Sequence, residues 1–149
     1  MKKYLIFIFI FFIIGCGYSP IYSTKKINNF NYLINNIEGD SLINLEFVNT
    51  LKRYKKNEGE KFILNINTKY SKKDLSKNLA GSITLYKITI DANIEIENNK
   101  FKKIFKLSEN SKMQKIDNKF DEQNYENLLK KSLAKSMAQK LVFELSQIK

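Results

Sequence analysis

The chain has 149 residues and a formal net charge of +11, with 26 basic and 15 acidic residues, one cysteine, and neither histidine nor tryptophan. The missing histidine and the single cysteine exclude His-based acid–base catalysis, Ser-His-Asp or Cys-His triads and His/Cys metal sites, so we expect no enzyme, no metal site and no cofactor. Arg53 is the only arginine, which is a weak signature for nucleic-acid binding, and we expect no nucleic-acid partner.

The first segment has the composition of a secretory signal. Lys2 and Lys3 precede an apolar run that is too short to span a bilayer comfortably, and Gly15-Cys16 closes this run. The pattern resembles a bacterial lipoprotein signal, in which the cysteine thiol is acylated and cleavage makes it the new N-terminus. We expect residues 1–15 to be removed and Cys16 to carry a diacylglyceryl group and a further acyl chain such as palmitate, because durable anchoring needs more than one chain. The alternative is an ordinary N-terminal anchor with an incidental cysteine.

Two elements are predicted in the next part of the chain. Residues 30–38 are a possible strand, with Tyr32 and Ile34 in one phase. From Ser41 to Lys56 apolar residues recur at helical spacing, and Gly59 follows as an end signal. We therefore expect a strand followed by an amphipathic helix.

Alternating patterns then predict further strands at residues 61–70 and 82–97. One face of the first is apolar from Phe62 to Tyr70, and one face of the second is apolar from Tyr86 to Ile96. Residues 71–80 and 108–119 are polar, so they are expected to be irregular connections. The sequence thus predicts strands that bury one face.

Asn98-Asn99 is predicted as a two-residue turn to a fourth strand. With this turn, each residue of the strand at 82–97 pairs with a residue of the fourth strand such that the two residue numbers sum to 197. The buried face acquires the pairs Ile96–Phe101, Ala92–Phe105 and Ile90–Leu107, and the polar face Glu95–Lys102 and Asp91–Lys106. Ile94 would meet Lys103 on the buried face. Either the fourth strand bulges there, or the outward Ile104 contacts a partner.

The last element is a helix with a predicted N-cap at Asp121 and a hydrophobic staple between Phe120 and Tyr125. Its apolar stripe comprises Tyr125, Leu128, Leu129, Leu133, Met137, Leu141, Leu145 and Ile148. The order of elements predicts one α/β (α+β) two-layer sandwich over residues 16–149, with two helices packed on one face of a mostly antiparallel four-stranded sheet.

Three stretches resemble the lipopolysaccharide-assembly lipoprotein LptE family. They are Cys-Gly-Tyr-Ser-Pro-Ile-Tyr at residues 16–22, the glycine-to-tyrosine approach to a long strand at residues 80–90, and the final helix rich in Leu, Ala and Lys. Leu85 departs from the polar or basic residue that often precedes the strand tyrosine. The resemblance implies an outer-membrane lipoprotein that plugs an LptD-type β-barrel, assists its assembly and helps deliver lipopolysaccharide to the outer leaflet. Gly17 after the cysteine favours the outer membrane.

The candidate contact residues follow from this resemblance. Lys87, Lys102 and Lys106 on the polar sheet face are candidates for binding lipopolysaccharide phosphates, although the default interpretation is that they are solvated charges that balance Asp91 and Glu95. The candidates for contact with the barrel are Tyr18, Tyr22 and Ile104; the alternative for the two tyrosines is that they pack under the first helix. The excess of lysine suits an anionic lipid surface or reflects an AT-rich coding bias.

Two other classes of function remain open at this stage. One is a generic envelope lipoprotein that binds lipid or serves as an accessory subunit of another transport complex. The other is a hydrolase that uses carboxylates such as Glu95 and Glu97, which are neighbours on one strand face. Nothing in the sequence desolvates these carboxylates.

Overall fold

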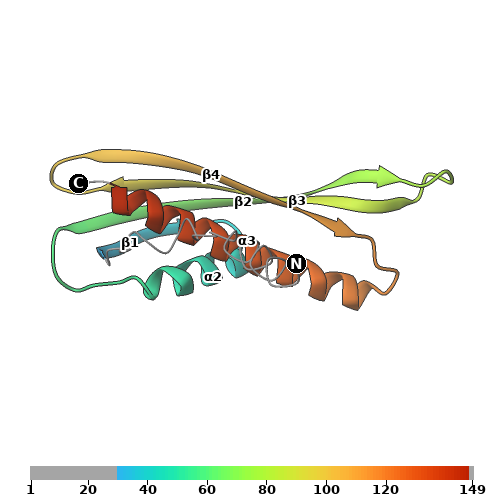
Figure 1. Cartoon of the computed structure of the whole chain (residues 1–149), viewed down its shortest axis with the longest axis horizontal. Helices are drawn as coiled ribbons and strands as arrows, with labels where there is room; N and C mark the ends of the chain where they lie inside the picture. The colour runs from blue at the N-terminus through green and yellow to red at the C-terminus, as the bar shows by residue number, and fades with distance from the viewer. Residues whose placement is uncertain (1–29, 148–149) are drawn as a thin grey trace, which may run out of the picture.

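The computed structural model describes residues 30–147, so the predicted signal, Cys16, Tyr18 and Tyr22 lie outside the described residues. A four-stranded sheet forms one layer, and two helices lie side by side on one of its faces (Figure 1). In chain order the elements are β1 (Asn31–Glu38), α2 (Ser41–Lys52), β2 (Lys61–Lys77), β3 (Ile83–Glu97), β4 (Lys102–Gln114) and α3 (Lys119–Gln147).

The strands follow the order β1-β2-β3-β4 in the sheet. β1 runs parallel to β2, and the other two pairs are antiparallel. This confirms the predicted α+β sandwich with a mostly antiparallel sheet. We call the sheet face packed against the helices the inner face and the opposite one the outer face. The distal end of the sheet is the end at the β2–β3 turn.

The core lies between the inner face and the helices. Alternate residues of β2 and β3 are buried there, as the apolar alternation predicts, and so are one stripe of α2 and one of α3. The largest fully buried side chains are those of Phe47, Ile43, Leu51, Leu64, Ile66, Ile88, Ile90, Ile94, Ile96, Met113, Met137 and Leu141. Fully burying one such side chain stabilises the fold by about 1.5–3 kcal/mol.

Helix α2 begins as predicted but ends earlier. The Asp40 carboxylate accepts hydrogen bonds from the backbone N–H groups of Leu42 (3.0 Å) and Ile43 (3.1 Å), which caps the first turn. The helix ends at Lys52 rather than at residue 56. The next residues bond to the backbone of Phe30 instead. The N–H group of Phe30 donates a hydrogen bond to the carbonyl oxygen of Tyr54, and the N–H group of Lys56 donates one to the carbonyl oxygen of Phe30.

Strands β2 and β4 are longer than predicted. β2 continues to Lys77 and β4 to Gln114, so the expected irregular connections at residues 71–80 and 108–119 were mostly wrong. Met113, near the end of β4, is fully buried opposite Tyr86. The polar composition of these strand ends concealed them from an analysis of apolar alternation.

The predicted β3–β4 register was wrong by two residues. The Asn98 side-chain oxygen accepts hydrogen bonds from the N–H groups of Lys100 and Phe101 (2.9 Å each), so the turn spans four residues and Glu97 pairs with Lys102. A shift of two preserves the faces, because side chains alternate with period two. The expected pairing of Ile94 with Lys103 does not occur, since Ile94 pairs with Phe105 and Lys103 lies opposite Ile96. The register is continuous, so β4 contains no bulge there.

Helix α3 starts before the predicted cap. The Asn118 side chain accepts hydrogen bonds from the N–H groups of Phe120 (2.9 Å) and Asp121 (3.4 Å), so Asn118 takes the capping role assigned to Asp121. Phe120 is itself helical and 70% exposed, so the predicted staple to Tyr125 is wrong. Leu128 is 63% exposed and does not belong to the buried stripe.

Candidate functional site

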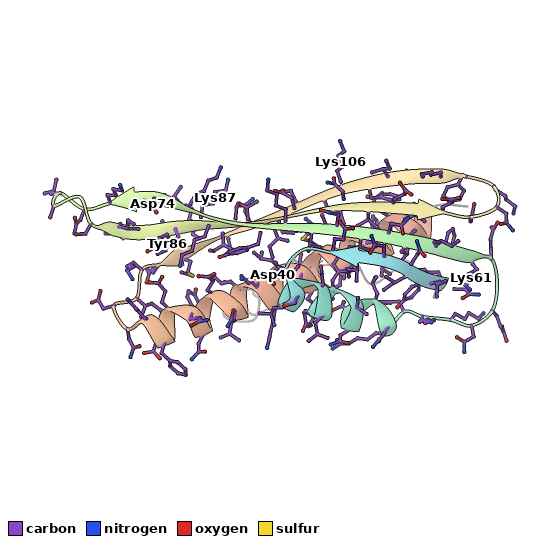
Figure 2. All side chains as sticks on the ribbon, turned by 180° about the vertical axis from the view of Figure 1, so that it is seen from behind. Asp40, Lys61, Asp74, Tyr86, Lys87 and Lys106 are labelled. Carbon is purple, nitrogen blue, oxygen red and sulfur yellow. The ribbon has the colours of Figure 1, made fainter. Side chains whose placement is uncertain are left out.

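The outer face of the sheet is a polar surface left uncovered by the helices. Figure 2 shows Lys87 and Lys106 on the side away from the helices, while Tyr86 and Asp40 lie on the helix side. Since successive side chains in a strand alternate, every second residue of β2, β3 and β4 lies on this outer face. Most of these residues are lysine, asparagine, serine, threonine or an acid.

The three lysines predicted to bind ligand all lie on the outer face but do not converge. Lys102 forms an ion pair with Glu95 (2.8 Å), and its hydrogen bond lowers the pKa of that carboxyl group. Lys106 lies opposite Asn93, in the middle of the strand pair. Lys87 lies ten positions from the residue that pairs with Lys102, about 30 Å away at the rise of a strand. One small ligand cannot contact Lys87 and Lys102 together.

Ile104 is an apolar side chain in polar surroundings on the outer face. It is 57% exposed, opposite Glu95, and lines a depression of about 220 Å³ with asparagine and glutamate side chains. Asn65 donates a hydrogen bond to Glu95 (3.2 Å) and accepts one from Asn35 (2.9 Å). The outward placement expected for Ile104 is confirmed, and its contact with a partner stays a prediction.

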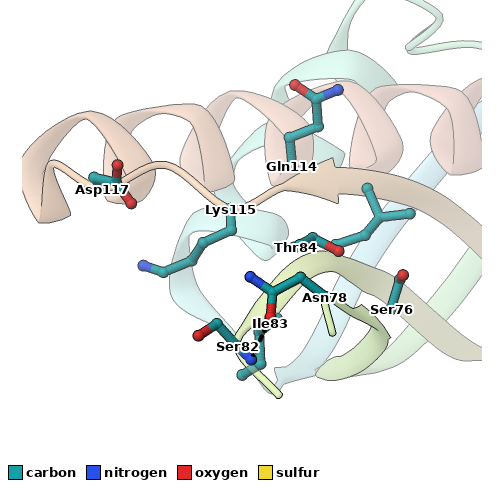
Figure 3. A pocket seen from close by; sticks show the side chains of 9 residues that line it. Ser76, Asn78, Ser82, Ile83, Thr84, Gln114, Lys115 and Asp117 are labelled. Carbon is teal, nitrogen blue, oxygen red and sulfur yellow. Dashed lines mark hydrogen bonds between the residues drawn. The ribbon is translucent and has the colours of Figure 1, made fainter. Parts of the chain in front are cut away.

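A larger groove of about 560 Å³ lies at the distal end, between the β2–β3 turn and the segment that joins β4 to α3 (Figure 3). Its lining residues are Ser76, Asn78, Ser82, Ile83, Thr84, Leu85, Gln114, Lys115 and Asp117. The turn is held by the Asn78 side chain, which accepts hydrogen bonds from Ala80 N–H (3.0 Å) and Ser82 N–H (2.9 Å). Gly81 adopts φ +80°, which favours glycine.

An ion-pair cluster on the inner face holds the first half of α3 against the distal sheet. Lys72 of β2 lies 2.8 Å from both Glu122 and Glu126 of α3, and Lys115 lies 2.6 Å from Glu122. Hydrogen bonds from Lys115 and then Lys72 lower the pKa of Glu122 to about 2. Because Lys115 also lines the distal groove, this cluster fixes one wall of the groove.

The cluster continues toward β1 through Glu126 and Lys130. The Tyr70 hydroxyl donates a hydrogen bond to Glu126 (2.6 Å), and burial together with this carboxylate raises the pKa of Tyr70. Lys130 bonds to Asp40 (3.0 Å) and lies 4.0 Å from the centre of the Tyr70 ring. Burial alone would raise the pKa of Asp40, but the hydrogen bonds from Lys130 and the N–H groups of α2 outweigh it and lower that pKa.

The chemistry of these residues suits binding better than catalysis. Within residues 30–147 no three His, Cys, Asp or Glu side chains are grouped so that they could hold a metal ion. Glu95, one of the two carboxylates considered for a hydrolase, has a lowered pKa, whereas a general acid needs a raised one. In the described part of the chain, no helix is both long and apolar enough to cross a bilayer.

Comparison with solved structures shows the fold. The chain is similar to the crystal structure of rare lipoprotein B from Shewanella oneidensis, with a TM-score of 0.60, 12% identity, and coverage of 78% of this chain and 94% of that one. It is also similar to lipoprotein B from Nitrosomonas europaea (TM-score 0.59, 15% identity, 80% and 84% covered). A third is a minor lipoprotein from Acinetobacter baumannii (TM-score 0.55, 14% identity, 78% and 93% covered). No protein-family model and no curated protein matches the sequence.

Proposed function

We propose that the protein is a lipid-anchored envelope lipoprotein of the LptE kind, which plugs an LptD-type outer-membrane β-barrel, assists its assembly and helps deliver lipopolysaccharide to the outer leaflet. The fold it shares with lipoproteins B supports this proposal, together with the lipoprotein-like signal that ends at Cys16. In this function the protein is not an enzyme, and its only added group is the lipid on Cys16.

The observation that carries the proposal is the polar outer face of a sheet whose other face is covered by helices. The lumen of a wide outer-membrane barrel is polar, so a plug must present polar surface to it. The outer face supplies lysine, asparagine and carboxylate side chains over the whole length of β3. Ile104, 57% exposed among them, supplies an apolar contact point for the barrel wall.

The anchor can be tested independently of the partner. In the variant Cys16→Ser we expect loss of lipid labelling and of signal cleavage, because the hydroxyl group does not replace the thiol as the acceptor of the diacylglyceryl group. The measurement is metabolic labelling with a radioactive fatty acid, followed by separation of inner and outer membranes. Labelling of the variant equal to that of the wild type would contradict the anchor.

The partner is tested by crosslinking in intact envelopes, purification through a C-terminal tag, and identification of attached proteins by mass. We expect an LptD-type barrel among them, and its misassembly when the lipoprotein is depleted. If the lipoprotein is recovered alone and the barrel assembles normally without it, the plug function is wrong. The second candidate, a lipid-binding envelope lipoprotein, would then take its place, supported by the groove at the distal end.

A further inference from the structure

The net positive charge of the described residues is concentrated at the end of the sheet opposite the β2–β3 turn. Residues 52–61, from the end of α2 to the start of β2, and residues 98–103, around the β3–β4 turn, lie at this end; Figure 2 shows Lys61 there and Asp74 toward the other end. We call these two segments the basic end. They hold two acidic and eight basic residues, the latter all exposed: Lys52, Arg53, Lys55, Lys56, Lys61, Lys100, Lys102 and Lys103.

The rest of the fold is electrically balanced. Residues 30–147 hold 21 basic and 15 acidic residues in all, which leaves 13 of each outside the basic end. Among the described residues, five of the eight basic side chains form no ion pair, and the other three pair with glutamates at 2.8–3.5 Å in contact with water. Exposed pairs of this kind are weak, and crowded like charges repel one another. An extended anionic surface would relieve this repulsion.

Contacts within the fold hold the basic end against the start of β1. The Asn31 side chain donates a hydrogen bond to the carbonyl oxygen of Asn57 in the first basic segment (3.4 Å). The ring of Phe62 lies 6.4 Å from that of Phe30 and 6.1 Å from that of Phe101 in the second segment, measured between ring centres. Both segments are therefore fixed next to the point where the chain leaves the described fold toward Cys16.

The length of the chain between Cys16 and Phe30 limits how the protein can stand on a membrane. Residues 17–29 span at most about 45 Å when fully extended. Lys61 pairs with Asn31, and the 17 residues of β2 place the distal end about 55 Å from this pair. An upright protein with its distal end on the membrane would need a longer connection. The basic end is within reach of the membrane.

We propose that the basic end docks on the anionic headgroups of the membrane that holds the lipid on Cys16, so that the sheet extends away from the bilayer and its distal end lies furthest from it. Each lysine or arginine near an anionic leaflet contributes about fivefold in affinity. An acyl anchor and a basic patch together give stable membrane attachment, and the patch adds a defined orientation. The proposal rests on the proposed function only for the lipid on Cys16 and needs no barrel.

The test uses the full-length lipid-anchored protein in phosphatidylcholine vesicles with or without phosphatidylglycerol. A bulky uncharged maleimide modifies an introduced thiol, either Asn57→Cys in the basic end or Leu79→Cys at the distal end, both exposed positions. Phosphatidylglycerol should slow modification of Asn57→Cys at least about tenfold and that of Leu79→Cys less than about twofold. Salt at about 1 M should abolish the difference, because it shortens the Debye length to about 3 Å.

A charge variant tests the basic end itself. In the Asn57→Cys background, Lys52→Gln/Arg53→Gln/Lys61→Gln removes three of the charges that form no ion pair among the described residues. It should raise the modification rate with phosphatidylglycerol about tenfold, back toward the rate without it. Circular dichroism checks folding, and the removal of like charges should leave the melting temperature equal or higher.

A matched control removes the same charge at the other end. Lys73, Lys87 and Lys112 are exposed and pair with one another across the outer face near the distal end. Lys73→Gln/Lys87→Gln/Lys112→Gln should change the modification rate of Asn57→Cys less than about twofold, because these lysines lie beyond a Debye length from the membrane. Equal recovery of the rate in both charge variants would overturn the proposal, since it would reveal attraction by net charge alone.

The remaining outcomes separate docking from the anchor. Equal rates with and without phosphatidylglycerol for Asn57→Cys would overturn the proposal, and so would equal protection of Leu79→Cys, because the sheet would then lie along the membrane. Flotation with phosphatidylcholine vesicles reports the lipid anchor alone. If the protein does not float, the anchor in the proposed function is wrong and docking falls with it. If it floats without protection of Asn57→Cys, only docking is wrong.

Discussion

Glu122 provides the sharpest test of how the two layers are joined. Its carboxylate accepts hydrogen bonds from Lys115 (2.6 Å) and Lys72 (2.8 Å), and also from the backbone N–H of Ile116 (3.3 Å). Replacement by glutamine keeps the shape of the side chain and removes the charge. We expect Glu122→Gln to destabilise the protein at neutral pH, because two lysines then lose a shared partner.

The magnitude follows from the pKa of this carboxyl group. Its fall from 4.5 to about 2 corresponds to an upper bound of about 3 kcal/mol. Contact of the cluster with water reduces this value, and we expect about 1–2 kcal/mol at pH 7. A carboxyl group whose pKa is lowered by folding stabilises above its unfolded pKa and loses this effect as pH falls. At pH 2.5 the difference between Glu122→Gln and the wild type should shrink to about a quarter.

The assay is urea denaturation followed by circular dichroism at pH 7 and pH 2.5, with the free energy of unfolding extrapolated to water. Glu144→Gln is a matched control, because Glu144 lies on the same helix, is exposed, and forms no ion pair among the residues that the structure describes. It should change stability by less than about 0.5 kcal/mol. A loss for Glu122→Gln that is equal at both pH values would refute the electrostatic explanation.

Three further changes probe the turns, the distal core and the outer face. Gly39→Ala should destabilise by more than about 2 kcal/mol, since Gly39 adopts φ +113° and the new Cβ atom would lie 2.0 Å from Thr68 O; Gly81→Ala, with open space around it, should cost less in the same melts. Met113→Ala should cost about 2–5 kcal/mol in urea denaturation if the end of β4 belongs to the core, and a negligible loss would contradict that assignment. Ile104→Thr, which keeps a β-branched side chain, should change stability by less than about 0.5 kcal/mol and lower the yield of copurified barrel; an unchanged yield would remove Ile104 from the proposed contact.

The sequence predicted those parts of the fold whose pattern is apolar. Alternation placed Leu64, Ile66 and Ile90 on the buried face, and helical spacing placed Phe47 and Met137 in the core, all of which is confirmed. The apolar alternation could not determine the β3–β4 register, because a shift by two residues leaves every side chain on the same face. The deciding feature is the Asn98 side chain, which closes a four-residue turn instead of a two-residue one.

The candidate site was only partly predictable for the same reason. Lys87 was found because it lies in an apolar alternating strand, whereas Lys73 and Lys112 lie in strand ends that looked like loops. The available signal was that Lys69, Ser71 and Lys73 occupy alternate positions of β2. It was weak, because Lys72 between Ser71 and Lys73 is polar as well, so no contrast between apolar and polar positions marked this end of the strand. Only the pairing of the strands brings the three lysines into one row.

The polar strand ends stay in the sheet because the helix facing them is polar too. On the inner face Lys72 meets two glutamates of α3, while Glu109 of β4 bonds to Ser136 (3.3 Å) and pairs with Lys140. Partly buried pairs of this kind add little net stability compared with apolar contacts, but each one left unmatched is costly. Sliding α3 along the sheet would separate every pair at once. The ionic layer therefore fixes the position of α3 on the sheet, and with it the groove wall at Lys115.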